Sequence, residues 1–179
     1  MTASESMTLS TKTGKGHKSK VKKKKSILAA SDPLELREIR KARDAFEIAE
    51  IDYKRAIKNG IAKKKYTQAS LGMKIGISQP SVSSLLKNAK GVVDPPEGFS
   101  GASPFEICQR YSIGKISKES LIDQLSRWKY AKPSKTDGFD DLLVDGPGTF
   151  YEVDRAVHYG IIEDDVYDEL LGLLSKKSE

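Results

Sequence analysis

Residues 66–87 constrain the fold more than any other stretch, because their glycines, caps and apolar positions fit two short helices that cross at a tight turn. Gly72 stands where the helices would touch, and only a very small residue fits there. Gly76 stands at the turn, where a left-handed backbone costs glycine little. Ser78 can cap the second helix, and Pro80 falls in its first turn, where a missing N–H is harmless. The inward positions are apolar, namely Leu71, Ile75, Ile77, Val82 and Leu85.

This stretch, above all Gly-Ile-Ser-Gln-Pro-Ser-Val-Ser at 76–83, resembles the helix-turn-helix regulators of bacteria and their phages. The resemblance implies that the second helix enters the major groove of double-stranded DNA, where its outward side chains meet base edges. By position, the side chains of the second helix that are expected to face DNA are those of Ser78, Gln79, Pro80, Ser81, Ser83 and Ser84.

Gln79 is the strongest candidate base reader, because its amide can form a bidentate pair with adenine. The serines are short and tolerate many bases, so the specificity of this helix alone is expected to be modest. The family uses a glutamine in the position of Gln68 to bind a backbone phosphate. Phosphate contacts are also expected from the flanking residues Lys63, Lys64, Lys65, Thr67, Lys87 and Lys90. The alternatives are a solvated basic face and a helical hairpin used for protein contact.

Positive charge is concentrated in the first half of the chain. Residues 1–26 hold eight lysines and one acid, residues 27–90 hold thirteen basic and seven acidic residues, and residues 91–179 hold ten basic and seventeen acidic residues. This distribution favours a polyanionic partner bound mainly by the front half. Residues 1–26 cannot build a core and are expected to be disordered. They serve either as an arm that neutralises phosphates or as a solubilising tail.

The rest of the chain predicts an all-α fold. A first helix is expected from residues 31–33 to a stop at 59–60, with an apolar stripe that packs on its own domain. A coiled-coil dimer is the alternative, although only about three heptads fit and Arg43 interrupts the seam. The stripe consists of Leu36, Ile39, Phe46, Ala49, Tyr53, Ala56 and Ile57. Prolines and glycines predict a linker at 91–101. The expected organisation is a disordered basic arm (1–26), a helix-turn-helix domain (27–90), the linker (91–101) and a second helical domain (102–175).

The second helical domain is expected to begin its first two helices at Ser103 and Ser117 and a later one at 148–149. It could oligomerise, cleave itself as some phage repressors do, or bind DNA. Self-cleavage is rejected because that chemistry uses a β-rich scaffold. Residues 127–135 favour DNA binding, since basic and aromatic residues alternate at a helix end, although a solvated helix end is the alternative. The DNA-binding candidates are Arg127, Lys129, Tyr130, Lys132 and Lys135, with Trp128 expected in the core.

Several classes of function are not indicated. A lone Cys108 excludes an internal disulfide, and no His, Cys or carboxylate cluster has metal-ligand spacing. We therefore expect no enzyme activity, no cofactor and no small-molecule ligand. No apolar run is long enough for a membrane span, so the chain is expected inside a cell. The resemblance to bacterial and phage regulators implies the cytoplasm of a bacterial host, in association with DNA.

Size, lysine tail, helix-turn-helix and the appended helical domain together resemble the immunity repressors of temperate mycobacteriophages. The resemblance implies a transcriptional repressor that maintains lysogeny and superinfection immunity by binding short asymmetric sites with both domains. It favours a monomer, while a dimer stays open. A phage recombination or replication accessory protein and a protein-interaction adaptor are the alternatives.

Overall fold

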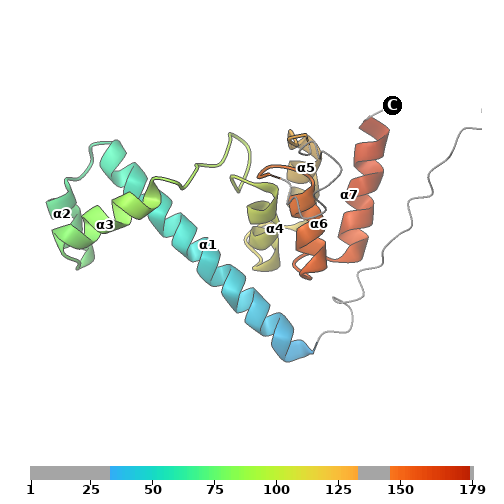
Figure 1. Cartoon of the computed structure of the whole chain (residues 1–179), viewed down its shortest axis with the longest axis horizontal. Coiled ribbons are helices and arrows are strands. Elements are labelled where there is room, and N and C mark those ends of the chain that lie inside the picture. The colour runs from blue at the N-terminus through green and yellow to red at the C-terminus, as the bar shows by residue number, and fades with distance from the viewer. Residues whose placement is uncertain (1–32, 133–145, 178–179) are drawn as a thin grey trace, which may run out of the picture.

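The computed structural model describes residues 33–132 and 146–177, and every regular element in these ranges is an α-helix, as predicted. The helices are α1 (Leu34–Ala62), α2 (Gln68–Ile75), α3 (Gln79–Ala89), α4 (Pro104–Ser112), α5 (Lys118–Arg127), α6 (Tyr151–His158) and α7 (Asp164–Lys177). In Figure 1, α2 and α3 lie at the C-terminal end of the long α1, and α4 to α7 are grouped beside its other part. The predicted basic arm at 1–26 lies outside the described residues.

Helix α1 continues past the expected stop at 59–60 and ends at Ala62. Gly60 is tolerated inside the helix, at a cost of about 1 kcal/mol relative to alanine, because its neighbours Ile57 and Ile61 pack against α2 and α3. The helix ends just before Lys64, whose φ of 53° is left-handed. A lysine therefore takes the backbone conformation that was predicted for a glycine.

The prediction that the apolar stripe of α1 packs on its own domain is wrong for most of its residues. Ile39, Phe46 and Tyr53 are 65%, 70% and 43% exposed, respectively. The buried residues of α1 are instead Asp44, Ile48, Arg55 and Ile57. Periodicity identified the apolar positions, but it could not show that the packing face carries charges that are paired across the interface.

Helices α2 and α3 pack against the C-terminal end of α1 and form a small apolar cluster with it. Its buried members are Ile57, Leu71 and Val82, surrounded by half-buried Ile61, Ile77, Leu85 and Leu86. The close approach at Gly72 and the left-handed turn at Gly76, with φ of 75°, are as predicted. Ile75 is an exception, since it ends α2 and is 44% exposed.

Gly72→Ala is expected to lower the free energy of unfolding by about 1–3 kcal/mol. A Cβ at Gly72 would lie 2.6 Å from the carbonyl oxygen of Ile77, so the methyl group must displace backbone. Gly91→Ala is the matched control, because a Cβ there meets nothing within 4 Å. Urea unfolding of both variants measures the difference. Equal stabilities would contradict the close crossing of α2 and α3.

The larger core lies among α4, α5, α6 and α7, with Ile107, Leu121, Leu125, Val153 and Leu170 in its centre. Trp128 contributes to this core, as predicted, and its ring meets that of Phe99 edge-on at a centroid distance of 5.0 Å. The predicted caps Ser103 and Ser117 are present on α4 and α5. Thr149 does not cap α6, since its hydroxyl donates to the carbonyl oxygen of Gly146.

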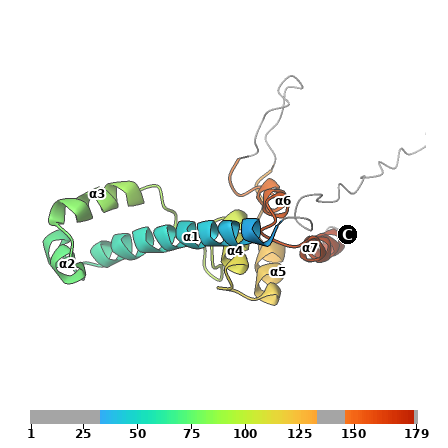
Figure 2. The ribbon, with the colours of Figure 1, turned by 90° about the horizontal axis from the view of Figure 1, so that it is seen from below.

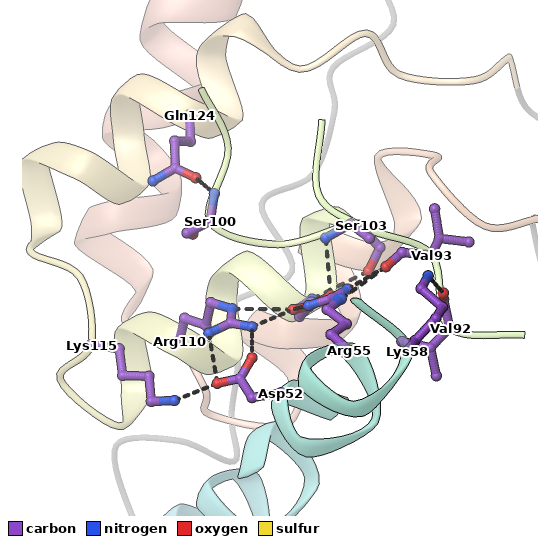
Figure 3. A network of polar contacts seen from close by, with 12 residues as sticks. Asp52, Arg55, Lys58, Val92, Val93, Ser100, Ser103, Arg110, Lys115 and Gln124 are labelled. Atoms are coloured by element: carbon purple, nitrogen blue, oxygen red, sulfur yellow. Dashed lines mark hydrogen bonds and ion pairs between the residues drawn. The ribbon is translucent and has the colours of Figure 1, made fainter. Parts of the chain in front are cut away.

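A buried polar interface joins α1 to α4 (Figure 3). Arg55 donates to both carboxylate oxygens of Glu106, at 2.6 and 2.8 Å, and Arg110 donates to the same carboxylate at 2.8 Å. Arg110 also pairs with Asp52, which accepts a further hydrogen bond of 2.7 Å from Lys115. Helix α1 is therefore shared by the two groups of helices.

The segment predicted as a linker is held by hydrogen bonds at both ends. Lys58 donates to the carbonyl oxygen of Val92 at 2.7 Å, and Arg55 donates to that of Val93 at 2.6 Å. The N–H of Ser100 donates to the side chain of Gln124 at 2.7 Å. Residues 91–101 thus connect the two groups of helices while they are bound to α1 and α5.

Stability should depend on pH through Asp52. Hydrogen bonding from Arg110, opposed by burial and reinforced by Lys115, lowers the pKa of Asp52 to about 2 from an ordinary value of 3.8. The stabilisation is therefore fully present above pH 3.8 and is lost as the pH falls to about 2. Urea unfolding at several pH values measures this effect. As the pH falls from 3.8 to about 2, Asp52→Asn is expected to lose less free energy of unfolding than the wild type. Identical pH profiles would contradict the pairing of Asp52 with Arg110.

Candidate nucleic-acid interface

The starts of α2 and α3 are both fixed by side-chain caps. The hydroxyl of Thr67 accepts the N–H of Ser70 at 3.1 Å, and the hydroxyl of Ser70 accepts the N–H of Thr67 at 3.0 Å. Ser78 accepts the N–H of Ser81 at 3.2 Å, so its predicted capping role is confirmed. These caps follow from the spacing of small hydroxyl residues ahead of each helix. The partial positive charge of a helix N-terminus therefore lies at each of the two starts.

A hydrogen bond links the first residues of the two helices. Nε2 of Gln79 donates to Oε1 of Gln68 at 3.0 Å. This contact orients the exposed amide of Gln79 and leaves it one N–H and its carbonyl oxygen for another partner. A donor and an acceptor side by side are what the major-groove edge of adenine binds. Sequence reasoning assigned Gln68 to phosphate and missed this contact, because the residues are eleven positions apart.

The other predicted residues of α3 differ in their accessibility. Pro80, Ser81 and Ser84 are exposed and Ser83 is half-buried. The hydroxyl groups of Ser78 and Ser81 are hydrogen-bonded to each other at 2.8 Å. Ser78 therefore caps the helix and also holds the hydroxyl of Ser81, while Ser84 is exposed to solvent.

The segment that carries α2 and α3 is basic. Residues 63–90 contain six lysines, all exposed, and no acidic residue. The exposed lysines flanking the two helices are Lys63, Lys64, Lys65, Lys87 and Lys90. The first three occupy the turn between α1 and α2, directly before the capped start at Thr67. An anion that approaches this end of the molecule meets positive charge and two helix N-termini together.

Two of the five residues in the second predicted DNA-binding set are engaged within the protein. Arg127 donates to the carboxylate of Asp123 at 2.6 Å and lies over the ring of Phe99. Tyr130 is half-buried, and its hydroxyl donates to the carbonyl oxygen of Leu125 at 2.9 Å. The proposal of Tyr130 as a DNA contact is therefore corrected, because the aromatic residues of this segment pack inward.

Two of the remaining members of that set are accessible. Lys129 and Lys132 are exposed on the segment that follows α5. Lys135 lies outside the described residues. The described part of the segment after α5 therefore offers two exposed lysines, rather than a continuous row of basic and aromatic groups, to a polyanion.

Within residues 33–132 and 146–177, no three His, Cys, Asp or Glu side chains are gathered where they could hold a metal ion. Cys108 is buried, and its burial raises the pKa of the thiol. Across the same ranges, no helix combines the length and apolar character needed to cross a bilayer.

Comparison of the chain with known protein families, with characterised proteins and with solved structures yielded no match. The interpretation of the surface at α2 and α3 therefore depends on its geometry and its charge.

Proposed function

We propose that this chain is a sequence-specific DNA-binding protein in which α2 and α3 form a helix-turn-helix. The N-terminal end of α3 enters the major groove, where Gln79 reads a base. The observation that carries this proposal is the exposed amide of Gln79, held by Gln68 at the start of α3. It lies within residues 63–90, which hold six exposed lysines and no acidic residue.

Affinity and specificity come from different groups in this proposal. The lysines at 63–65 and at Lys87 contact phosphates and release counterions, so binding weakens as salt rises. The N-terminus of α2 binds a phosphate, to which its backbone N–H groups donate hydrogen bonds. Gln79 offers one N–H and one oxygen to the N7 and N6 positions of adenine. The short serines beside it add little discrimination.

The biological role that we propose is transcriptional repression of the phage immunity type. The protein would occupy sites on DNA in the bacterial cytoplasm and block polymerase. A reporter promoter that carries the selected site tests this role, with repression as the expected result. Unchanged expression, despite tight binding in vitro, would favour a recombination or replication accessory function instead.

Gln79→Ala is expected to weaken binding to the selected site by about 1–3 kcal/mol, while affinity for random DNA stays nearly unchanged. The loss arises because the alanine leaves the adenine edge without its paired donor and acceptor. Fluorescence anisotropy on both DNAs at one salt concentration provides the measurement.

Asn88→Ala is the matched control, since it removes an exposed amide from the other end of α3. It should leave both affinities unchanged. Gln68→Ala should weaken only specific binding, and by less than Gln79→Ala. The amide of Gln79 is still present in this variant, but it is no longer held in one orientation by Gln68. Equal losses on specific and random DNA would show that Gln79 does not read a base. Affinity that is weak and independent of salt for wild-type protein would favour a protein-interaction adaptor.

A further inference from the structure

One face of α1 carries a regular apolar pattern that residues 33–132 and 146–177 leave exposed. Large residues recur every seventh position at Ile39, Phe46 and Tyr53, and an alanine follows each of them after three positions. We call these six residues, Ile39, Ala42, Phe46, Ala49, Tyr53 and Ala56, the outer face of α1. All six are exposed, and Phe46 is 70% exposed.

The outer face lies opposite the side of α1 that packs on α4. At about 100° per residue, Phe46 and Ile48 project to sides of the helix roughly 160° apart. Ile48 is fully buried, and Arg55 is bound to Glu106 of α4. In Figure 2, which views the molecule from below, α1 lies across α4, and no other helix crosses in front of its middle. The face is therefore open along the repeat.

We propose that the outer face of α1 binds the same face of a second copy of this chain, with the two helices antiparallel. In the register that centres the repeat, Phe46 lies against Ala49 of the second copy. Ile39 then lies against Ala56, and Tyr53 against Ala42. Each layer combines one large and one small side chain, which lets the helices approach closely and fill the space between them. A parallel pair would place aromatic rings on aromatic rings and leave gaps at the alanines.

The charges beside the outer face complement each other in the same arrangement. Arg43 and Glu50 follow the large residues by four positions and line one edge of the face. The antiparallel register brings Arg43 of each copy next to Glu50 of the other. Among the described residues, Arg43 pairs with Glu47 at 2.8 Å and Glu50 pairs with Lys54 at 2.7 Å, and Arg43 and Glu50 are both exposed. Such pairs contribute little to stability, so the same charged groups can also form ion pairs with a second helix.

The size of the face indicates reversible pairing. Residues 39–56 span about 26 Å of helix. A contact between two single helices of this length buries less surface area than a standard protein interface. We therefore expect self-association at micromolar concentrations. The register also places Gly60 of the two copies about 37 Å apart along the paired helices, so the two α2–α3 units lie at opposite ends of the dimer. The self-association does not depend on the proposed function.

Sedimentation equilibrium of the full chain without DNA tests the proposal. The wild type is expected to show a monomer–dimer equilibrium at micromolar concentrations. Phe46→Glu should raise the dissociation constant at least about tenfold. Met73→Glu is the matched control, because Met73 is 81% exposed but lies outside the face, and it should leave the equilibrium unchanged. A wild type that stays monomeric throughout, or a Phe46→Glu variant that dimerises equally well, would overturn the proposal.

Charge exchange tests the register and also covers the case in which Phe46→Glu fails to fold. Arg43→Glu and Glu50→Arg should each weaken dimerisation about threefold or more, and the double variant should restore it. Restoration of Arg43→Glu by Glu38→Arg instead would overturn the antiparallel arrangement, because those positions meet in a parallel pair. Circular dichroism of each variant shows whether the helices are intact.

Discussion

Glu106→Ala is expected to lower the free energy of unfolding by about 3–5 kcal/mol. Glu106 is buried and is the shared acceptor for Arg55 of α1 and Arg110 of α4, so its removal leaves two buried guanidinium groups without this partner. Burial raises the pKa of Glu106, but hydrogen bonds from Arg55, the backbone of Ala102 and Arg110 outweigh it and hold the pKa below its ordinary value. Glu106 is therefore an ionised carboxylate in the folded protein.

Chemical denaturation of purified protein measures this loss. Glu97→Ala is the control, since Glu97 is an exposed acid in the segment between α3 and α4, and its removal should change stability little. Glu106→Gln should lie between the two, because the amide can still accept hydrogen bonds although it carries no charge. A loss for Glu106→Ala that is no larger than for Glu97→Ala would contradict the role of this carboxylate in joining α1 to α4.

Replacing Lys63, Lys64 and Lys65 together by glutamine is expected to weaken binding to any DNA by more than about tenfold and to reduce the salt slope by up to about 2.7. Three exposed charges are lost next to the capped start of α2, while side-chain length is kept. Titrations of random and selected DNA at several salt concentrations give both quantities. Similar losses on the two DNAs are expected, because phosphate contacts carry no sequence information.

The double variant Lys129→Gln/Lys132→Gln is the comparison for that experiment. It removes the two exposed lysines of the segment after α5. A salt slope reduced by about 0.9 per charge in this variant would show that the rear helices also contact DNA. An unchanged slope would assign binding to α2 and α3 alone. If the triple variant leaves the slope unchanged, the lysines at 63–65 do not bind phosphate.

Local rules predicted the structure well where one residue determines one feature. The close crossing at Gly72, the turn at Gly76 and the cap at Ser78 each depend on the backbone within a few residues. The packing of α1 was not predictable in this way. Its inner face includes Arg55, whose charge is paired with Glu106, a residue fifty-one positions further along the chain. A rule that places apolar residues inside therefore selected the wrong face.

The same distinction applies to the candidate interface. The exposed position of Gln79 and the basic flanks could be predicted from the sequence, since both follow from the motif and from composition. The hydrogen bond from Gln79 to Gln68 depends on how α2 and α3 cross, so it required coordinates. Tyr130 was assigned to DNA because a sequence of basic and aromatic residues does not show which side chains turn inward. Its hydroxyl bonds to the backbone of Leu125 instead.

Selection of binding sites from random double-stranded DNA, carried out in parallel with wild-type protein and Gln79→Ala, tests the central claim most directly. The account predicts that the wild type enriches a defined sequence and that Gln79→Ala loses the preference for adenine at one position while it keeps the rest. Enrichment of no sequence by the wild type, or of an identical sequence by both proteins, would contradict the assignment of α3 as the helix that reads DNA.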